Sequence, residues 1–106
     1  MAAFDTAITP VSSAPANTSK ATLFTASADS SVLVDVANIG TGEVAVRVGI
    51  TPSGGSVHWK MFDYVIPVAN SYVGLGPLVL QSGDAVTVRT DTADDAVFSL
   101  TGVETS

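Results

Sequence analysis

Apolar and polar side chains alternate strictly in the middle of this chain. Over residues 44–50, valine or isoleucine recurs at every second position, and alanine, arginine and glycine fill the positions between. Residues 31–38 repeat the pattern, with Val32, Val34 and Val36 on one face. Because successive side chains of a strand point to opposite sides, this period of two predicts half-buried β-strands.

Turn signals divide the rest of the chain into short segments of the same kind. Glycine-bearing breaks fall at residues 38–42, 52–56 and 82–84, and a further turn falls at residues 68–70. Turns at intervals of roughly ten residues are typical of a sandwich or barrel. The expected strands cover residues 23–24, 31–38, 44–50, 58–67, 72–80, 86–88 and 97–103. We predict an all-β fold, an antiparallel two-sheet β-sandwich that is jelly-roll-like and has seven or eight strands.

The first twenty residues differ from the rest. Residues 9–19 are rich in proline, serine and alanine and show no period, which is typical of an extended arm. We therefore divide the chain into an N-terminal arm over residues 1–20 and a β-sandwich domain over residues 21–106. The arm is either a loose tail or a segment that lies along a neighbouring molecule, and the sequence leaves both interpretations open.

Charged residues are scarce, at 13% of the chain against about 25% in ordinary soluble domains, and the net charge is −6. So few charges protect a small β-domain poorly against association, which favours a surface covered by a partner over a merely neutral one. The basic residues are scattered one to a segment, which argues against nucleic-acid binding. They are Lys20, Arg47, Lys60 and Arg89.

The sequence also bears on where the chain is made and kept. No apolar run approaches the ~20 residues that span a bilayer. The N-terminus lacks the basic and long apolar regions of a secretory signal. We expect a protein made in the cytoplasm and without a membrane partner.

No motif carries recognisable catalytic or metal chemistry. The chain has no cysteine and one histidine, His58, which cannot build the common zinc sites. The nucleophile elbow of hydrolases is missing too. Three aspartates within residues 91–95 are a weak calcium candidate, because their spacing is not that of an EF-hand loop. We therefore expect no enzymatic activity, no cofactor and no metal.

Aromatic residues gather after the glycine-rich loop at residues 52–56. Trp59 comes first, and simple alternation then places Phe62 and Tyr64 on the same face as Ile66. Aromatic residues in a strand of a small sandwich are more often core than not, but such a group is also a candidate platform for a sugar. Both interpretations are carried forward.

The order of these segments resembles a small β-domain of tailed-phage virion structural proteins, found on heads, necks and tail appendages. The likeness covers about residues 21–104 and departs at residues 25–29, where the related domains have a Pro-Ala-Gly turn. It is carried by Leu23-Phe24-Thr25-Ala26, residues 32–38, 44–50, His58-Trp59-Lys60, and residues 63–67, 69–71, 74–76, 78–80, 82–86, 88–89 and 98–104. The resemblance implies a virion component without catalysis.

We therefore expect a capsid decoration (cement) protein that binds the major capsid protein on the outer surface of the head, as a homotrimer. The alternative is a host- or glycan-binding module of a neck or tail appendage. The contacts would come from two places. One is the N-terminal arm, which would become ordered on a neighbouring molecule, and the other is the segment of exposed aromatic residues. The candidate interface residues are Phe4, Ile8, Val11, Trp59 and Tyr64.

Overall fold

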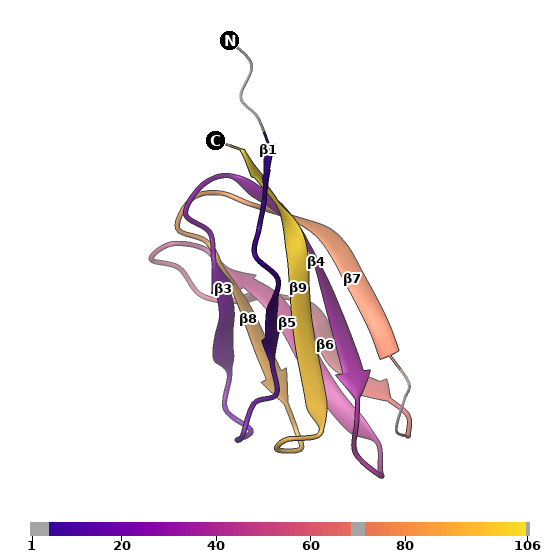
Figure 1. Ribbon diagram of the computed structural model, residues 1–106. Helices are drawn as coiled ribbons and strands as arrows, with labels where there is room; N and C mark the ends of the chain where they lie inside the picture. The colour runs from indigo at the N-terminus through magenta and orange to yellow at the C-terminus, as the bar shows by residue number, and fades with distance from the viewer. Residues whose placement is uncertain (1–4, 69–71, 106) are drawn as a thin grey trace.

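Two antiparallel sheets face each other in a computed structural model of the chain, which describes residues 5–68 and 72–105 (Figure 1). The five-stranded sheet contains β1 (Asp5–Ala7), β2 (Val11–Ser13), β9 (Ala96–Thr105), β4 (Ser30–Asn38) and β7 (Tyr72–Leu80). The four-stranded sheet contains β3 (Ala21–Thr25), β8 (Ala85–Thr90), β5 (Val44–Thr51) and β6 (His58–Ile66). The predicted all-β, two-sheet antiparallel sandwich is confirmed.

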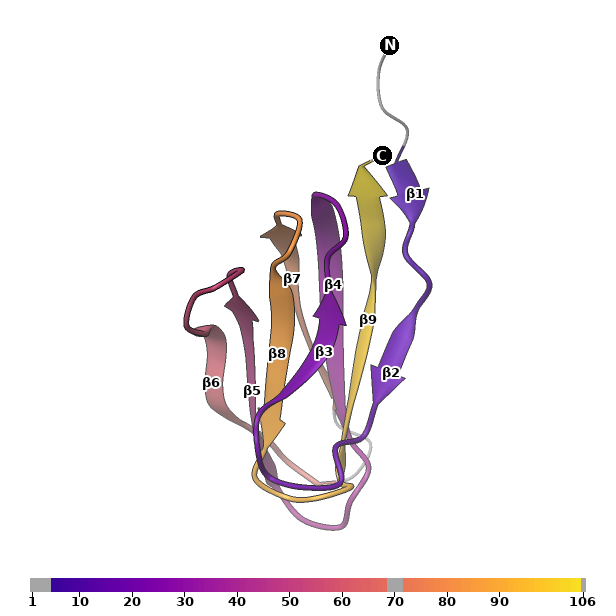
Figure 2. The same cartoon turned by 90° about the vertical axis from the view of Figure 1, so that its left-hand side faces the viewer.

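The strand order is that of one long hairpin rolled up on itself. Folding the chain back between β5 and β6 pairs β5 with β6, β4 with β7, β3 with β8 and β2 with β9, and all four pairs are antiparallel. Rolling the hairpin adds the pairs β4·β9 and β5·β8 and closes the two sheets (Figure 2). This arrangement is a jelly roll.

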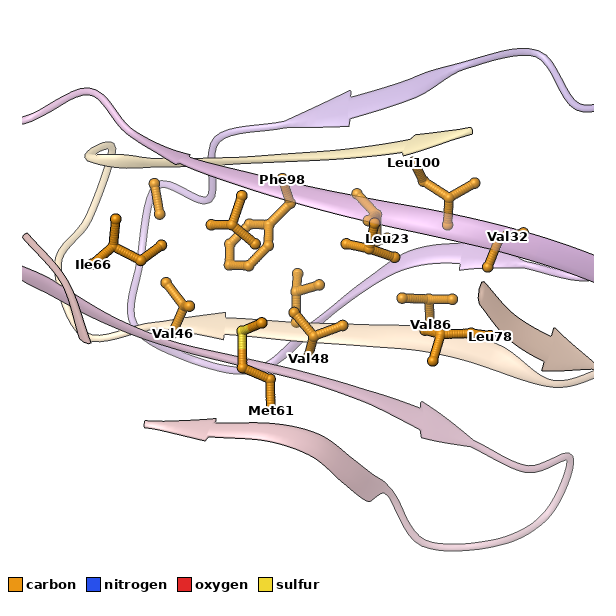
Figure 3. Packing of buried hydrophobic residues seen from close by; sticks show 14 of the residues in the cluster. Leu23, Val32, Val46, Val48, Met61, Ile66, Leu78, Val86, Phe98 and Leu100 are labelled. Atoms are coloured by element: carbon orange, nitrogen blue, oxygen red, sulfur yellow. The ribbon is translucent and has the colours of Figure 1, made fainter. Parts of the chain in front are cut away.

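The core lies between the sheets and is built from the inward-facing half of each strand (Figure 3). Val32, Val34 and Val36 of β4 are fully buried, as alternation predicts, and so are Phe98 and Leu100 of β9 beside them. Burying a side chain of this size contributes about 1.5–3 kcal/mol. The valine-rich strands therefore stabilise the sandwich and leave their alternate residues on the outer faces.

The predicted arm contributes two strands, which raises the count in the described part of the chain from the expected seven or eight to nine. β1 and β2 pair with successive stretches of β9, and the Ile8 amide donates to the Gly102 carbonyl across 2.9 Å between them. Ile8 and Val11 are half-buried against the core. Strands of three residues are too short to show a period, which is why the sequence pattern did not reveal them. The domain boundary at residue 20 stays a prediction.

A buried asparagine ties the middle of the hairpin together. The Asn38 side-chain amide donates to the carbonyl oxygens of Gly42, Ile66 and Pro67, and its oxygen accepts from the Gly40 amide. The residue is fully buried, so these bonds satisfy groups that would otherwise be costly to remove from water. They fix the end of β6 against the turn between β4 and β5, and β6 carries the surface described next.

Candidate interaction surface on the four-stranded sheet

Large aromatic side chains are exposed on β6, the edge strand of the four-stranded sheet. Phe62 is 59% exposed and Tyr64 is 48% exposed, while Trp59 is half-buried. Aromatic residues are usually removed from water in a domain of this size, so two exposed on one strand mark a candidate interaction surface. Of the two interpretations carried forward, the one that places these aromatic residues in the core is wrong for Phe62 and Tyr64.

A β-bulge explains why simple alternation misplaced Phe62, whereas Tyr64 pairs with buried Val46 and is exposed because β6 is an edge strand. Met61 pairs with Val48 and Tyr64 pairs with Val46, so Phe62 and Asp63 together lie opposite Arg47. The extra residue shifts the period by one, and a bulge of this kind re-aims the side chains next to it. Phe62 therefore does not share a face with buried Ile66. Instead, both Phe62 and Asp63 reach the Arg47 side chain on the outer face of the sheet.

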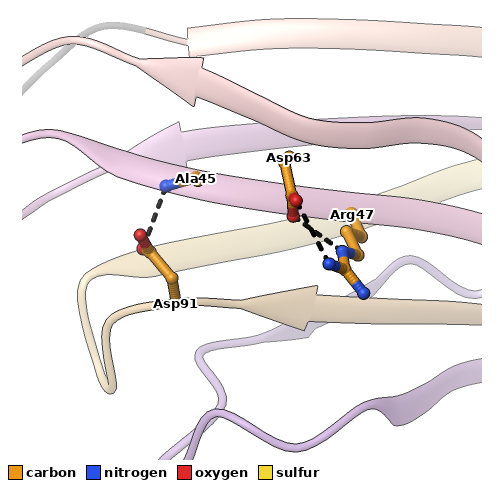
Figure 4. Close-up of polar contacts among 4 residues, drawn as sticks. All are labelled: Ala45, Arg47, Asp63 and Asp91. Atoms are coloured by element: carbon orange, nitrogen blue, oxygen red, sulfur yellow. Dashed lines mark hydrogen bonds and ion pairs between the residues drawn. The ribbon is translucent and has the colours of Figure 1, made fainter.

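Arg47 is held from two directions. Its Nε lies 2.7 Å from Oδ1 of Asp63 and its Nη2 lies 3.1 Å from Oδ2, a two-pronged ion pair (Figure 4). Its Cζ lies 3.9 Å from the centre of the Phe62 ring and 5.7 Å from that of Trp59. Both ring distances are within the range of cation–π attraction. The guanidinium is therefore held in position at the surface by neighbouring side chains of the same sheet.

Arg89 of β8 stands directly opposite Arg47 in the register of the two strands. The hydrogen bond from Arg47 holds the pKa of the Asp63 carboxyl below its ordinary value, and the positive charges of Arg47 and Arg89 act in the same direction. Arg89 itself makes no ion pair with any described residue. We call Arg47, Trp59, Phe62, Asp63 and Arg89 the Arg47 patch.

The fold gathers basic residues that are scattered in the sequence. All four lie in strands of the four-stranded sheet or, for Lys20, immediately before one. The strands of the five-stranded sheet contain acidic residues and no basic one. This separation was missed by sequence reasoning, because it depends on which strands pair. The signal in the sequence that pointed to this surface was Arg47, which alternation places on the outward face of its strand in a chain with few charges.

The residues predicted for an interface fall into separate places. Phe4 lies outside the described residues, and Ile8 and Val11 pack against the core at the edge formed by β1 and β2. Trp59 belongs to the Arg47 patch, and Tyr64 lies on the same strand. β6 and β2 stand at opposite edges of the sandwich (Figure 2), so the structure does not bring the arm residues and the aromatic residues together.

Other possible sites hold little chemistry. Asp91 accepts a hydrogen bond from the Ala45 amide at 2.9 Å (Figure 4), and no three acidic or histidine side chains within residues 5–68 and 72–105 gather as a metal site would require. A groove of about 500 Å³ between β6 and β7 contains Lys60 as its one ionisable side chain. None of the described residues forms a helix long and apolar enough to cross a bilayer.

The fold is a jelly-roll β-sandwich, and comparison with solved structures gives particular neighbours of this fold. A chain from the T13 particle of infectious bursal disease virus superposes with a TM-score of 0.58 at 11% identity, over 98% of this chain but 32% of that chain. A chain of the Bacillus endospore appendages, which are disulfide-linked pili, also scores 0.58, at 19% identity over 98% and 88% of the two chains.

A third neighbour comes from a bacteriophage. A chain in the capsid structure of Helicobacter pylori bacteriophage KHP30 scores 0.54 at 11% identity, over 97% of this chain and 94% of that one. At these identities the likeness concerns the fold. No protein-family model matches the chain, and neither does any curated protein. The three neighbours have in common that each belongs to a large assembled structure.

Proposed function

We propose that this chain is a virion structural protein, specifically a capsid decoration protein that binds the outer surface of a phage head. The observation that carries the proposal is the match to the phage KHP30 capsid chain, which is nearly complete in both directions. The superposition covers 97% of this chain and 94% of that one, so one jelly roll accounts for nearly all of that chain. A jelly roll on a phage head would bind the major capsid protein.

A decoration protein acts by binding, without a reaction step. Whatever binds the assembled shell and not its separated subunits stabilises the shell by mass action. A sandwich with a rigid valine core and few surface charges suits this role, because little order is lost on docking. We also propose a homotrimer. Ile8, Val11, Trp59 and Tyr64 are proposed as contact residues, either with the head or between chains.

The test is co-sedimentation of the purified protein with phage heads that lack it, together with its mass in solution. Binding that saturates at a fixed number of copies per head, with heads that become more resistant to heat, is the expected result. A mass of three chains would support the trimer separately. Failure to bind heads at any protein concentration would refute the decoration role.

A host- or glycan-binding module of a neck or tail appendage is the second candidate, and the exposed aromatic rings of β6 favour it. Sugar rings stack on open aromatic faces. Here the Arg47 guanidinium lies 3.9 Å from the centre of the Phe62 ring, and the Trp59 and Phe62 rings meet edge to face at 65°. The Trp59 and Phe62 rings therefore do not form one flat platform, so we rank the candidate second. A glycan-binding screen tests it directly.

A further inference from the structure

We infer that the Arg47 patch is the surface that docks on the head, and that the capsid surface it fits presents a carboxylate to Arg89 beside an apolar group over Phe62. The inference rests on the proposed decoration function and adds to it the docking face and the chemistry of the partner. Three properties of the patch carry it: its charge, its exposed apolar area and its rigidity.

The Arg47 patch contains one carboxylate fewer than it has guanidinium groups. It contains two guanidinium groups on directly opposed positions of β5 and β8 and a single acidic group, Asp63. Like charges placed opposite each other in a sheet are unfavourable, and Asp63, although its charge also acts on Arg89, forms its ion pair with Arg47. Arg89 has no ion-pair partner among the described residues. A partner carboxylate at Arg89 would complete two balanced pairs, in a molecule whose net charge is −6.

Apolar area lies next to this charge. Phe62 is 59% exposed and Val65 is 51% exposed on β6, and the half-buried Trp59 supports the Phe62 ring from the side. Buried aromatic residues and arginines are the groups that dominate binding at protein interfaces. Docking would remove the Phe62 ring from water and would place the Arg89 contact in a drier environment, where it is stronger.

The patch is already ordered. Arg47 is pinned by a two-pronged ion pair and by two rings, and the bulge fixes the direction of Phe62. A side chain that is immobile before binding loses little entropy on binding.

Strand addition at a sheet edge is a poor alternative, because all four edges are interrupted. β3 and β6 contain register shifts, β7 carries Pro77, and Pro10 separates β1 from β2. Such bulges and prolines are the usual protection against edge pairing. Contacts through an outer face therefore remain. The outer face of the five-stranded sheet is the competing candidate, because it exposes Val79. We rank it lower because its strands contain acidic residues and no basic residue that could pair with a partner carboxylate.

The experiment measures binding of purified variants to heads that lack the protein. Arg89→Glu and Phe62→Ala are each expected to weaken binding at least tenfold, and Arg89→Gln to weaken it less while making binding less sensitive to salt. Lys20→Glu is the matched control, since it changes the net charge by the same amount outside the patch and should bind like the unaltered chain. Thermal unfolding of each variant shows that the sandwich is intact.

The possible outcomes separate the inference from the proposed function. Equal binding by the unaltered chain, Arg89→Glu and Phe62→Ala overturns the inference and leaves the decoration role standing. Loss of binding confined to Val79→Ser would assign docking to the five-stranded sheet, and displacement by free saccharide would assign the patch to glycans. Each of these overturns the inference as well. No binding by the unaltered chain would refute the decoration role itself.

Discussion

Asp63 occupies a backbone conformation that most residues avoid. Its φ of 51° lies in the left-handed region, which aspartate and asparagine enter more readily than other side chains. The bulge imposes this conformation, and the same bulge brings the carboxylate within hydrogen-bonding distance of Arg47. At the residue scale, one position therefore combines a tolerated backbone strain with the ion pair that orders the Arg47 patch.

The pH dependence of stability tests whether this ion pair stabilises the fold. Arg47 holds the pKa of the Asp63 carboxyl below its ordinary value, so the folded state retains the charged form that the unfolded state loses first. The stabilisation is therefore complete above the ordinary aspartate pKa of about 4 and disappears as the pH falls through the lowered value. Asp63→Asn should be less stable than the unaltered chain at neutral pH, and this difference should vanish in acid.

Urea denaturation of the two proteins between pH 7 and pH 2.5 measures that difference. Asparagine tolerates the same backbone conformation, so the substitution changes the charge without adding strain. Asp29→Asn, at an exposed position without a hydrogen bond among the described residues, serves as the control. A difference in stability that stays constant over the whole pH range would show that the ion pair is not its source.

β4 and β9 form the central pair of the five-stranded sheet, and Gly102 lets them approach closely. A Cβ added at Gly102 would lie 2.8 Å from the Val32 Cα, closer than such atoms approach in proteins. The strands would have to separate along the row of residues that faces the core. At the scale of elements, the spacing of this pair depends on one missing side chain.

Gly102→Ala should lower the free energy of unfolding by about 1–3 kcal/mol, the usual cost of forcing an extra methyl group into a packed site. Gly42→Ala is the matched control, because a Cβ there meets nothing within 4 Å. Denaturation curves of the two variants give the comparison. Equal stability of both would mean that β4 and β9 can separate without cost, contrary to the packing described here.

The strands themselves were predictable to the extent that they repeat a period of two. Val32, Val34 and Val36 lie inside as their spacing indicates, and the fold class follows from several such segments. The bulge at Phe62 and Asp63 was not predictable, because one extra residue in a strand has no compositional signature and reverses the face of every residue after it. The opposition of Arg47 and Arg89 also required the pairing of β5 with β8.

For the whole molecule, the rolled hairpin makes the first strands depend on the last. β2 pairs with β9, so the N-terminal edge of the five-stranded sheet can form only when nearly the entire chain is present. Contacts between residues so distant in sequence are slow to form in folding. Ile8 and Val11 then cover one side of the core, and β1 and β2 occupy the edge of β9.

Removing residues 1–13 should therefore lower the free energy of unfolding by about 2–4 kcal/mol, through lost apolar burial and lost ladder hydrogen bonds. The truncated protein should also associate, because β9 becomes an open edge. Thermal unfolding and light scattering measure the two effects. A synthetic peptide of residues 5–13 added to the truncated protein should reverse both. An unchanged unfolding temperature would show that these strands are dispensable.

The pairing of β1 with β9 also has a practical meaning. Asp5 lies opposite Thr105, so the first and last described strands leave the sandwich together at one pole (Figure 1). A peptide fused at residue 5 and another fused at residue 105 would therefore start next to each other. A short linker across that gap, with new ends opened in the loop between β5 and β6, would give a circular permutant that keeps every strand pair. Foreign sequences displayed on either strand would therefore project from the same region of the surface.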